Sequence, residues 1–178
     1  MLSVAYLGTT YLEDASFETS WNADGNVCAL TYSRLDVSGI ISAVGDDTAG
    51  ATAVFIGTTR NSFAGKTVAR LEYQAYSKLA IKTMADIMKA ACQLVSRSDD
   101  QPENQAVPSL IRCAVHHRLG TVPVGEPSIV IAVSSPHRKE AFVACEFLLE
   151  EIKSKAQIWK REFYEGEDDR NAEWKSNK

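Results

Sequence analysis

Apolar side chains recur every three or four positions between residues 77 and 96. This spacing puts them on one face of a helix, and that face must be buried against another layer of the protein. Met84 and Met88 fit either core packing or a groove for a partner, and core packing is the favoured interpretation. The periodic positions are Ala80, Met84, Ile87, Met88, Ala91, Leu94 and Val95.

Short apolar runs on both sides of this helix predict strands. The predicted strands are residues 51–58, the segment after the Ala64-Gly65 turn, 110–117 and 128–134. The first has the composition of a buried strand. In the second, Ala69, Leu71 and Tyr73 are expected on one face, with Arg70 and Glu72 on the other.

A second helix is predicted to begin at Ser135-Pro136, with the serine as its cap and the proline in its first turn. Its buried side is expected to comprise Ala141, Ala144 or Cys145, Leu148 and Ile152. Helices and strands therefore occur in one chain without repeats, which indicates a single α+β domain.

The remaining segments give weaker signals. Residues 2–7 and 27–32 fit short strands on either side of an Asp24-Gly25 turn. Asp36 is suited to cap a short helix that ends near residue 44. The polar residues 97–108 predict a long solvated loop, and residues 166–170 an exposed one.

Composition and charge exclude several classes of protein. A chain of 178 residues with a net charge of −4 and 45% hydrophobic residues is typical of one globular domain and not of a general nucleic-acid binder. No apolar run reaches the roughly 20 residues that span a bilayer. Because no Lys or Arg precedes Arg34, the basic region of a secretory or transit signal is missing, and we expect a cytoplasmic location.

The cysteines are scattered, without a C-x-x-C pair. Neither a zinc site nor a disulfide framework is expected, and no metal or cofactor motif is present. Free and mostly buried thiols are the favoured interpretation. A hydrolase that uses Cys113 and His137 stays an open alternative, although no nucleophile motif accompanies either residue. The four cysteines are Cys28, Cys92, Cys113 and Cys145.

Three cationic positions are candidates for binding an anion. Arg60 follows a predicted strand in a Gly-Thr-Thr loop, whose N–H and hydroxyl groups suit an oxyanion. His137 and Arg138 fall in the first turn of a helix, where unpaired N–H groups attract anions. Lys153 and Lys160 lie seven residues apart around an Ile-Trp step. They share a helix face if the helix continues, or Lys160 folds back on a strand if it breaks near residue 157.

The paired histidines at 116 and 117 are a further candidate. On a strand, neighbouring side chains point to opposite faces, so the pair is a poor chelate. One histidine is therefore expected in the core and the other at the surface.

Five stretches, taken together and in this order, resemble the large, catalytic subunit of molybdopterin synthase over about residues 35–165. They are Gly50–Asn61, Leu71–Tyr76, Val115–Gly120, Ala132–Arg138 and Lys153–Glu162. The resemblance implies an α/β hammerhead-type α+β fold with a mixed or antiparallel sheet and two main helices. It divides the chain into an extension or strand pair at 1–33, the catalytic-subunit domain at 34–165 and a charged tail at 166–178.

The resemblance also implies a reaction and its partners. Two sulfurs would pass to cyclic pyranopterin monophosphate (precursor Z), forming the dithiolene of molybdopterin. The sulfurs would come from the thiocarboxylated C-terminal Gly-Gly tail of a small ubiquitin-like sulfur-carrier subunit. Large subunits of this family form a homodimer within a heterotetramer. No cofactor is implied, since the partner supplies the reactive sulfur.

By the same resemblance, Lys153 and Lys160 are the catalytic candidates. Lys153 would handle the carrier tail and the transfer intermediate, and Lys160 would act as an anion clamp or proton donor. The expected substrate-binding residues are Arg60, His137, Arg138, Arg161 and Glu162, with His137 and Arg138 completing the neighbouring protomer's site.

Two positions depart from the family pattern. Gln74 stands where a glutamate is expected, and Gln157 replaces a proline before the Ile-Trp step and is expected to loosen the turn that positions Lys160. Two other functional classes stay open: a non-catalytic module that binds an anion or pterin, and a scaffold subunit. Neither would depend on both lysines.

Overall fold

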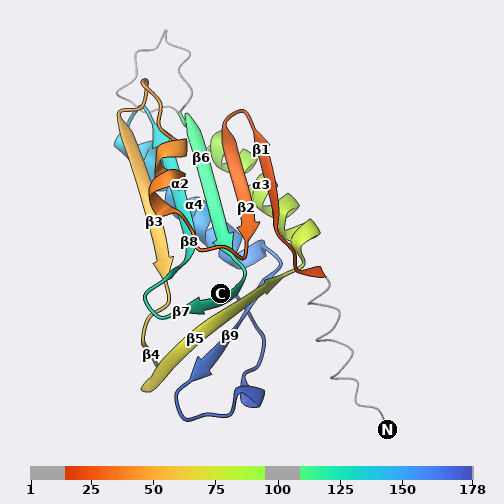
Figure 1. Cartoon of the computed structure of the whole chain (residues 1–178). Helices are drawn as coiled ribbons and strands as arrows, with labels where there is room; N and C mark the ends of the chain where they lie inside the picture. Colours follow the sequence, from red (N-terminus) through yellow and green to blue (C-terminus); the bar gives the residue numbers. More distant parts are fainter. Residues whose placement is uncertain (1–14, 95–108, 178) are drawn as a thin grey trace.

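The computed structural model describes residues 15–94 and 109–177, which form two sheets and three α-helices (Figure 1). The larger sheet has five strands in the order β1-β2-β6-β8-β3. Its strands are β1 (Thr19–Ala23), β2 (Asn26–Thr31), β3 (Ala51–Thr58), β6 (Arg112–Arg118) and β8 (Pro127–Ser135). Only β2 and β6 pair in parallel in this sheet, and its other neighbours are antiparallel, so the predicted mixed sheet is confirmed.

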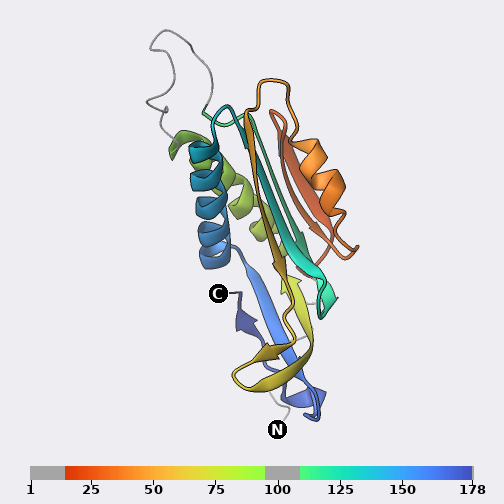
Figure 2. The same ribbon diagram turned by 90° about the vertical axis from the view of Figure 1, so that its left-hand side faces the viewer.

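Helices cover both faces of the larger sheet. The two long helices, α3 (Ser77–Leu94) and α4 (Arg138–Lys155), lie on one face, and the short α2 (Val37–Ala43) lies on the other (Figure 2). Every residue of the interior strand β8 is buried as a result. The Asp36 side chain caps α2 by accepting a hydrogen bond from the Gly39 N–H at 3.0 Å, as predicted. Among the described residues, no helix is long and apolar enough to cross a membrane.

The main core lies between the larger sheet and the two long helices. The described periodic positions of α3 are buried there, which confirms core packing for Met84 and Met88. Ala141, Ala144, Cys145, Leu148 and Ile152 form the buried side of α4, as its spacing predicts. Burying these apolar faces supplies most of the stability of such helices.

The smaller sheet stands at one end of the larger one (Figures 1 and 2). It is built on the long strand β5 (Lys66–Ala75), which pairs with three other strands of this sheet. The fourth pairs with one of those three. Those strands are β4 (Ser62–Phe63), β7 (Gly120–Pro123), β9 (Ile158–Tyr164) and β10 (Lys175–Ser176), with a 3-10 turn at Asp169–Asn171 before the last. Gly120 takes a φ of +71° where the chain leaves β6 for β7, a conformation that favours glycine.

Three local predictions are wrong. Strand β3 is an edge strand and not a fully buried one, so Val54 and Ile56 are exposed. A bulge between Val68 and Arg70 shifts the alternation in β5, so Val68 is buried and Ala69 is exposed. Helix α4 begins at Arg138 instead of Ser135-Pro136.

The reason for the later helix start is the engagement of Ser135 in β8. Its backbone pairs with Ala51, and its hydroxyl donates a hydrogen bond to the Ser109 carbonyl at 2.7 Å. The chain can therefore turn into a helix only after Pro136, and His137 takes the cap position without a side-chain cap bond.

The amino-terminal region gains a strand that the sequence did not suggest. β1 and β2 form a hairpin across Asp24 and Gly25, which take φ values of +53° and +79°. Through β2 this hairpin is part of the larger sheet. The strand predicted at 2–7 and the loop predicted at 97–108 lie outside the described residues. The three-segment division of the chain stays a prediction.

Candidate anion-binding active site

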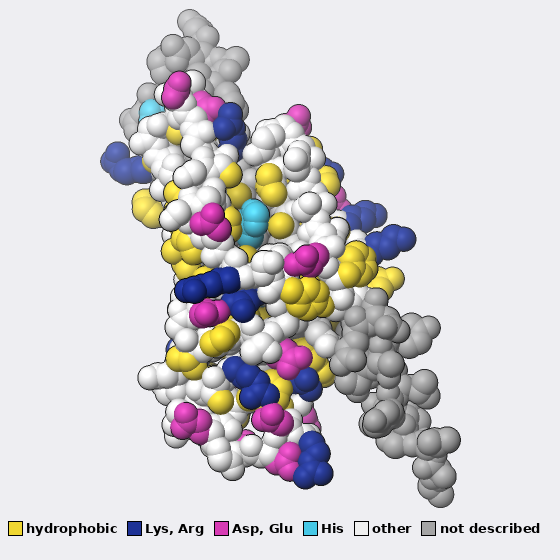
Figure 3. All heavy atoms as spheres, in the orientation of Figure 1, with side chains coloured by type: hydrophobic (Ala, Val, Ile, Leu, Met, Phe, Trp, Pro, Cys, Tyr) yellow, Lys and Arg dark blue, Asp and Glu magenta, His cyan; other side chains and the backbone are white. Residues whose placement is uncertain are grey.

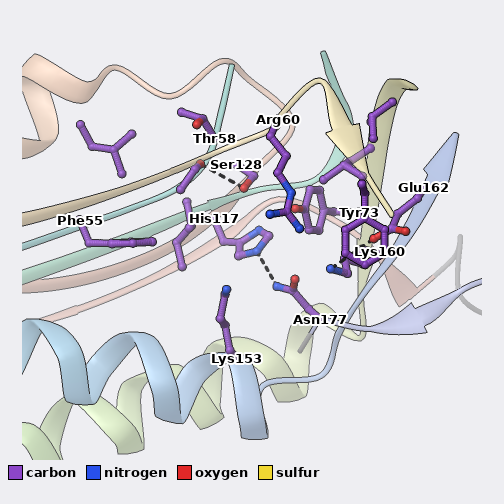
Figure 4. A pocket seen from close by; sticks show the side chains of 16 residues that line it. Phe55, Thr58, Arg60, Tyr73, His117, Ser128, Lys153, Lys160, Glu162 and Asn177 are labelled. Carbon is purple, nitrogen blue, oxygen red and sulfur yellow. Dashed lines mark hydrogen bonds and ion pairs between the residues drawn. The ribbon is translucent and has the colours of Figure 1, made fainter. Parts of the chain in front are cut away.

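A cavity of about 410 Å³ lies where the two sheets meet (Figure 4). Its walls come from β3, β6 and β8 of the larger sheet, from β5 and β9 of the smaller one, and from the end of α4. Three cationic side chains, Lys153, Lys160 and Arg60, line it together with the carboxylate of Glu162. Segments far apart in sequence therefore bring cations to one site.

The two lysines reach the cavity from different elements. Helix α4 ends at Lys155, and β9 begins at Ile158 after a two-residue turn. Of the two geometries left open by the sequence, the helix therefore breaks and the following strand carries Lys160 back to the site. Lys153 points into the cavity from the last turn of α4, while Lys160 faces it from the third position of β9 (Figure 4).

Gln157 holds this turn in place. Its Oε1 accepts a hydrogen bond from the Thr83 hydroxyl at 3.0 Å, and its Nε2 donates to the Lys155 carbonyl at 2.9 Å. Its own carbonyl accepts from the Tyr76 N–H at 3.0 Å. The Gln157 amide makes bonds to α3 and α4 that proline cannot make, and the expected loosening of the turn stays a prediction.

Glu162 anchors the cationic groups of β9 and β10. Its Oε1 lies 3.5 Å from the Lys160 ammonium, and its Oε2 lies 3.7 Å from the Lys175 ammonium. The Tyr164 hydroxyl donates a hydrogen bond to the same Oε2 at 2.6 Å. Burial raises the pKa of Glu162, but the Tyr164 hydrogen bond and the two lysines outweigh it and lower the pKa overall. Glu162 is therefore an ionised partner that fixes the position of Lys160.

Arg60 stands on the opposite rim, directly after β3. Its guanidinium lies 5.1 Å from the centre of the Phe63 ring, a cation–π contact that keeps it beside the cavity. The preceding Thr59 is buried, and its N–H donates to the Glu126 carbonyl at 3.1 Å, which fixes the loop. A substrate anion in the cavity would therefore meet one guanidinium and two ammonium groups.

His117 forms part of the cavity floor and is 1% exposed. Its Nδ1 lies 2.8 Å from the Arg118 carbonyl, and its Nε2 lies 3.0 Å from Nδ2 of Asn177. Because a carbonyl can only accept, Nδ1 carries the proton and Nε2 accepts from the amide. Burial lowers the pKa of His117 to about 4, so the ring is neutral at neutral pH. The expected split of the histidine pair is confirmed, since His116 is only half-buried.

Three predicted substrate-binding residues lie outside this cavity. His137 and Arg138 stand at the start of α4, about 22 Å from Lys153 along the helix axis at 1.5 Å per residue. Arg161 points to the other face of β9, where it bonds Glu72 at 3.0 Å and lies over the Trp174 ring. Alternation along the strand explains this, since Lys160 and Glu162 face the cavity and Arg161 does not.

Some residues of the site were missed in the sequence. Tyr73 packs edge-on against the His117 ring, with centroids 4.9 Å apart, and the alternation of β5 contained a signal for it. His117 was not missed, because the paired histidines were a further candidate and one of them was expected in the core. Asn177 gave none, because it reaches the site through the pairing of a two-residue strand at the other end of the chain. Phe55 and Ser128 also line the cavity.

Cys113 cannot serve as the nucleophile of a hydrolase in this structure. It is fully buried, and its hydrogen bond with Cys92 and its burial raise the pKa of its thiol. All four cysteines are free; three are buried and Cys92 is exposed. The favoured interpretation of mostly buried free thiols is confirmed.

Comparisons with known proteins agree with this geometry. The sequence model of the family described as MoaE protein matches residues 30–155. Molybdopterin synthase catalytic subunit 2 of Aedes aegypti is 44% identical over 153 residues, which cover 86% of this chain and 90% of that protein. The molybdopterin synthase catalytic subunit of Pyricularia oryzae is 44% identical over 155 residues, covering 87% and 76%.

Solved structures show the same fold. Molybdopterin synthase from Staphylococcus aureus superposes with a TM-score of 0.68 at 29% identity and covers 82% of this chain and 94% of its own. A complex of subunits 1 and 2 of molybdopterin-converting factor from Helicobacter pylori contains a chain with a TM-score of 0.60 at 21% identity, covering 79% and 86%. At that identity the second likeness supports the fold alone.

Proposed function

This chain belongs to the MoaE family of molybdopterin synthase catalytic subunits, and from that premise we propose which of its residues carry out the sulfur transfer. The substrate is cyclic pyranopterin monophosphate, and the sulfur donor is the thiocarboxylated C-terminal tail of a small carrier subunit. The observation that supports this assignment most strongly is the convergence of Lys153, Lys160 and Arg60 on one cavity of an otherwise acidic chain.

Charge complementarity is the physical basis of the proposal. The phosphate of the substrate and the thiocarboxylate of the donor are both anions, and two anions must approach each other for the sulfur to move. Cations fixed around a partly enclosed cavity offset this repulsion, and they interact more strongly there than in bulk water. Three cations against the one carboxylate of Glu162 leave the cavity with a positive excess.

The positions of the side chains suggest separate roles. Lys153 points into the cavity from the last turn of α4 and is the group we assign to the carrier tail and the transfer intermediate. Lys160 is half-buried and held by Glu162, which suits a fixed anion clamp or proton donor. Arg60 lies beside Phe63 at the cavity, and no carboxylate within residues 15–94 and 109–177 pairs with its guanidinium, whose donors suit a phosphate. We also propose a cytoplasmic location for the reaction.

A single-turnover experiment tests the catalytic role. The chain is mixed with a thiocarboxylated small subunit and precursor Z, and dithiolene product is measured for wild type, Lys153→Ala and Lys155→Ala. Lys155 is the matched control, since it lies on the same helix turn, is exposed and pairs with Glu151 instead of lining the cavity. We expect product from wild type and the control and a loss of at least about a hundredfold in Lys153→Ala. Equal rates in all three would contradict the assignment.

We propose a homodimer of this chain, with a small subunit bound at each site. Strand β3 is an edge of the larger sheet among the described strands, and it carries the exposed Val54 and Ile56. Exposed Phe142 and Val143 lie on α4, which packs beside β3. Hydrophobic side chains also gather along that margin in Figure 3. An unpaired strand edge flanked by apolar side chains is a typical subunit contact.

The same contact offers a role for His137 and Arg138. They follow Ser135, which pairs with Ala51 at one end of β3, while the other half of β3 lines the cavity and Arg60 follows it. A two-fold axis at β3 would bring the start of α4 in one protomer beside the cavity of its partner. Mixing inactive His137→Ala/Arg138→Ala and Lys153→Ala chains should then restore activity in mixed dimers. Absence of such complementation under conditions of subunit exchange would contradict a shared site.

A further inference from the structure

Residues 175–177 lie beside the cavity, and Asn177 lines it. Strand β10 pairs antiparallel with the start of β9, so that Lys175 is opposite Lys160 and Ser176 is opposite Trp159. The pairing continues through the Asn177 N–H, which donates to the Ile158 carbonyl at 3.2 Å. The strand that carries Lys160 is therefore bordered on this side by the carboxyl-terminal segment.

Side chains attach this short strand at three points. Trp174 lies over the Arg161 guanidinium at 4.7 Å, on the face of β9 away from the cavity. Lys175 lies 3.7 Å from Glu162, the same carboxylate that holds Lys160. The first two points are exposed or half-buried, so each contributes little by itself.

The third point is different because it is buried. Asn177 is 8% exposed and lines the cavity, and its amide donates at 3.0 Å to Nε2 of His117 (Figure 4). His117 is locked in the tautomer that leaves Nε2 free to accept, since its Nδ1–H is bonded to a carbonyl. A buried donor matched to a buried acceptor is costly to break, because both groups would lose their partners without gaining water.

We propose that Asn177 is a positioning residue for the sulfur-transfer site, which through its bond to His117 holds β10 across β9 and so fixes Lys160 and Glu162. This inference rests on the proposed function of the cavity. On this inference, residues 175–177 form part of the wall of the site and keep its charged groups in position. His117 contributes as the fixed acceptor on the cavity floor, and Lys175 adds to the electrostatic field at Glu162.

The primary test compares Asn177→Ala with Ser176→Ala in single-turnover assays with the thiocarboxylated small subunit. Ser176 is on the same strand but its side chain is exposed, so it is the matched control. Asn177→Ala should slow sulfur transfer by about tenfold to a hundredfold, since small misplacements of reacting groups have effects of this size. Ser176→Ala should react like wild type. A wild-type rate in Asn177→Ala, or a faster one that would mark β10 as an obstruction, overturns the proposal.

A pH profile separates this hydrogen bond from general packing. In Asn177→Asp, a carboxylate faces the His117 lone pair at neutral pH, and uptake of one proton restores a donor between them. The rate relative to wild type should therefore rise from about pH 8 to about pH 6 for Asn177→Asp and stay constant for Asn177→Ala. A constant ratio for both variants contradicts the role of the bond. Among the described residues, the charged or titratable groups that line the cavity together with His117 are Lys153, Tyr73, Lys160, Glu162 and Arg60, all unchanged in these variants.

Hydrogen exchange keeps the inference testable apart from the function. Deuterium uptake by residues 158–161 should increase in Asn177→Ala and not in Ser176→Ala, because loss of the anchor frees the edge of β9. If wild type forms no product, the proposed function fails while this measurement still decides the anchoring. Unchanged uptake in Asn177→Ala overturns the inference whatever the activity.

Discussion

Lowering the pH from about 7 to about 5 should destabilise this protein chiefly through His117. Its folded pKa is about 4, against an ordinary value of 6.5, because the ring is buried in neutral form. The unfolded chain therefore binds a proton that the folded chain excludes. The stability linked to His117 is complete above pH 6.5 and is lost as the pH falls towards 4.

The two pKa values set the size of the effect. The fall in the pKa of His117 from 6.5 to about 4 corresponds to about 3 kcal/mol of unfolding free energy in full. About 2 kcal/mol of this is lost between pH 7 and pH 5. Carboxylates with lowered pKa values, such as Glu126 and Glu162, contribute mainly below their ordinary value of 4.5. Half-buried His116, whose pKa burial also lowers, acts in the same direction as His117.

Urea unfolding of wild type and His117→Gln at several pH values measures this difference. The variant lacks the titrating ring, so its free energy of unfolding should fall less between about pH 7 and pH 5, by about 2 kcal/mol. His116→Gln is the control and should retain most of the wild-type pH dependence. Equal slopes for wild type and His117→Gln, or a ring that titrates near 6.5 by NMR, would refute the reasoning.

Two further predictions concern the turn and a thiol. Gln157→Ala removes two side-chain hydrogen bonds and should lower the free energy of unfolding by about 1–3 kcal/mol. In a double-mutant cycle, removing the Thr83 hydroxyl should cost much less in the Gln157→Ala background than in wild type. An unchanged urea midpoint would contradict the described turn. The hydrogen bond from Cys113 lowers the pKa of exposed Cys92, so alkylation should reach Cys92 first and below its ordinary pKa of 9.0. Mass spectrometry after brief labelling should find the other thiols unmodified.

The long elements of this fold could be predicted because their sequences contain a clear period. The apolar stripes of α3 and α4 and the continuous apolar run of β8 each match one kind of element, and the structure has them there. The short hairpin partner β1 was missed, since TSWNA alternates too weakly to be distinguished from a loop. The bulge in β5 was missed because a single inserted residue has no signature in the composition of a strand.

Within the site, local sequence brings side chains together only where they are near in the chain, and the resemblance alone joined Arg60 to the two lysines. Lys153, Lys160 and Glu162 fall within ten residues, and the resemblance marked them correctly as neighbours. Arg161 was misplaced because facing depends on where β9 begins, which in turn depends on where α4 ends. Asn177 could not be found, because its contact with His117 spans 60 residues and is created by sheet pairing.

The connection between α4 and β9 is two residues long, and the faces of β9 depend on whether that length is even or odd. Side chains of β9 alternate between the cavity and its opposite face, so inserting or deleting one residue at Ala156 or Gln157 would exchange the two sets. Trp159 and Arg161 would then turn inward in place of the groups that now line the cavity. A change of length in a surface loop would leave the faces of β9 as they are. An odd-numbered change between α4 and β9 would instead remove Lys160 and Glu162 from the cavity.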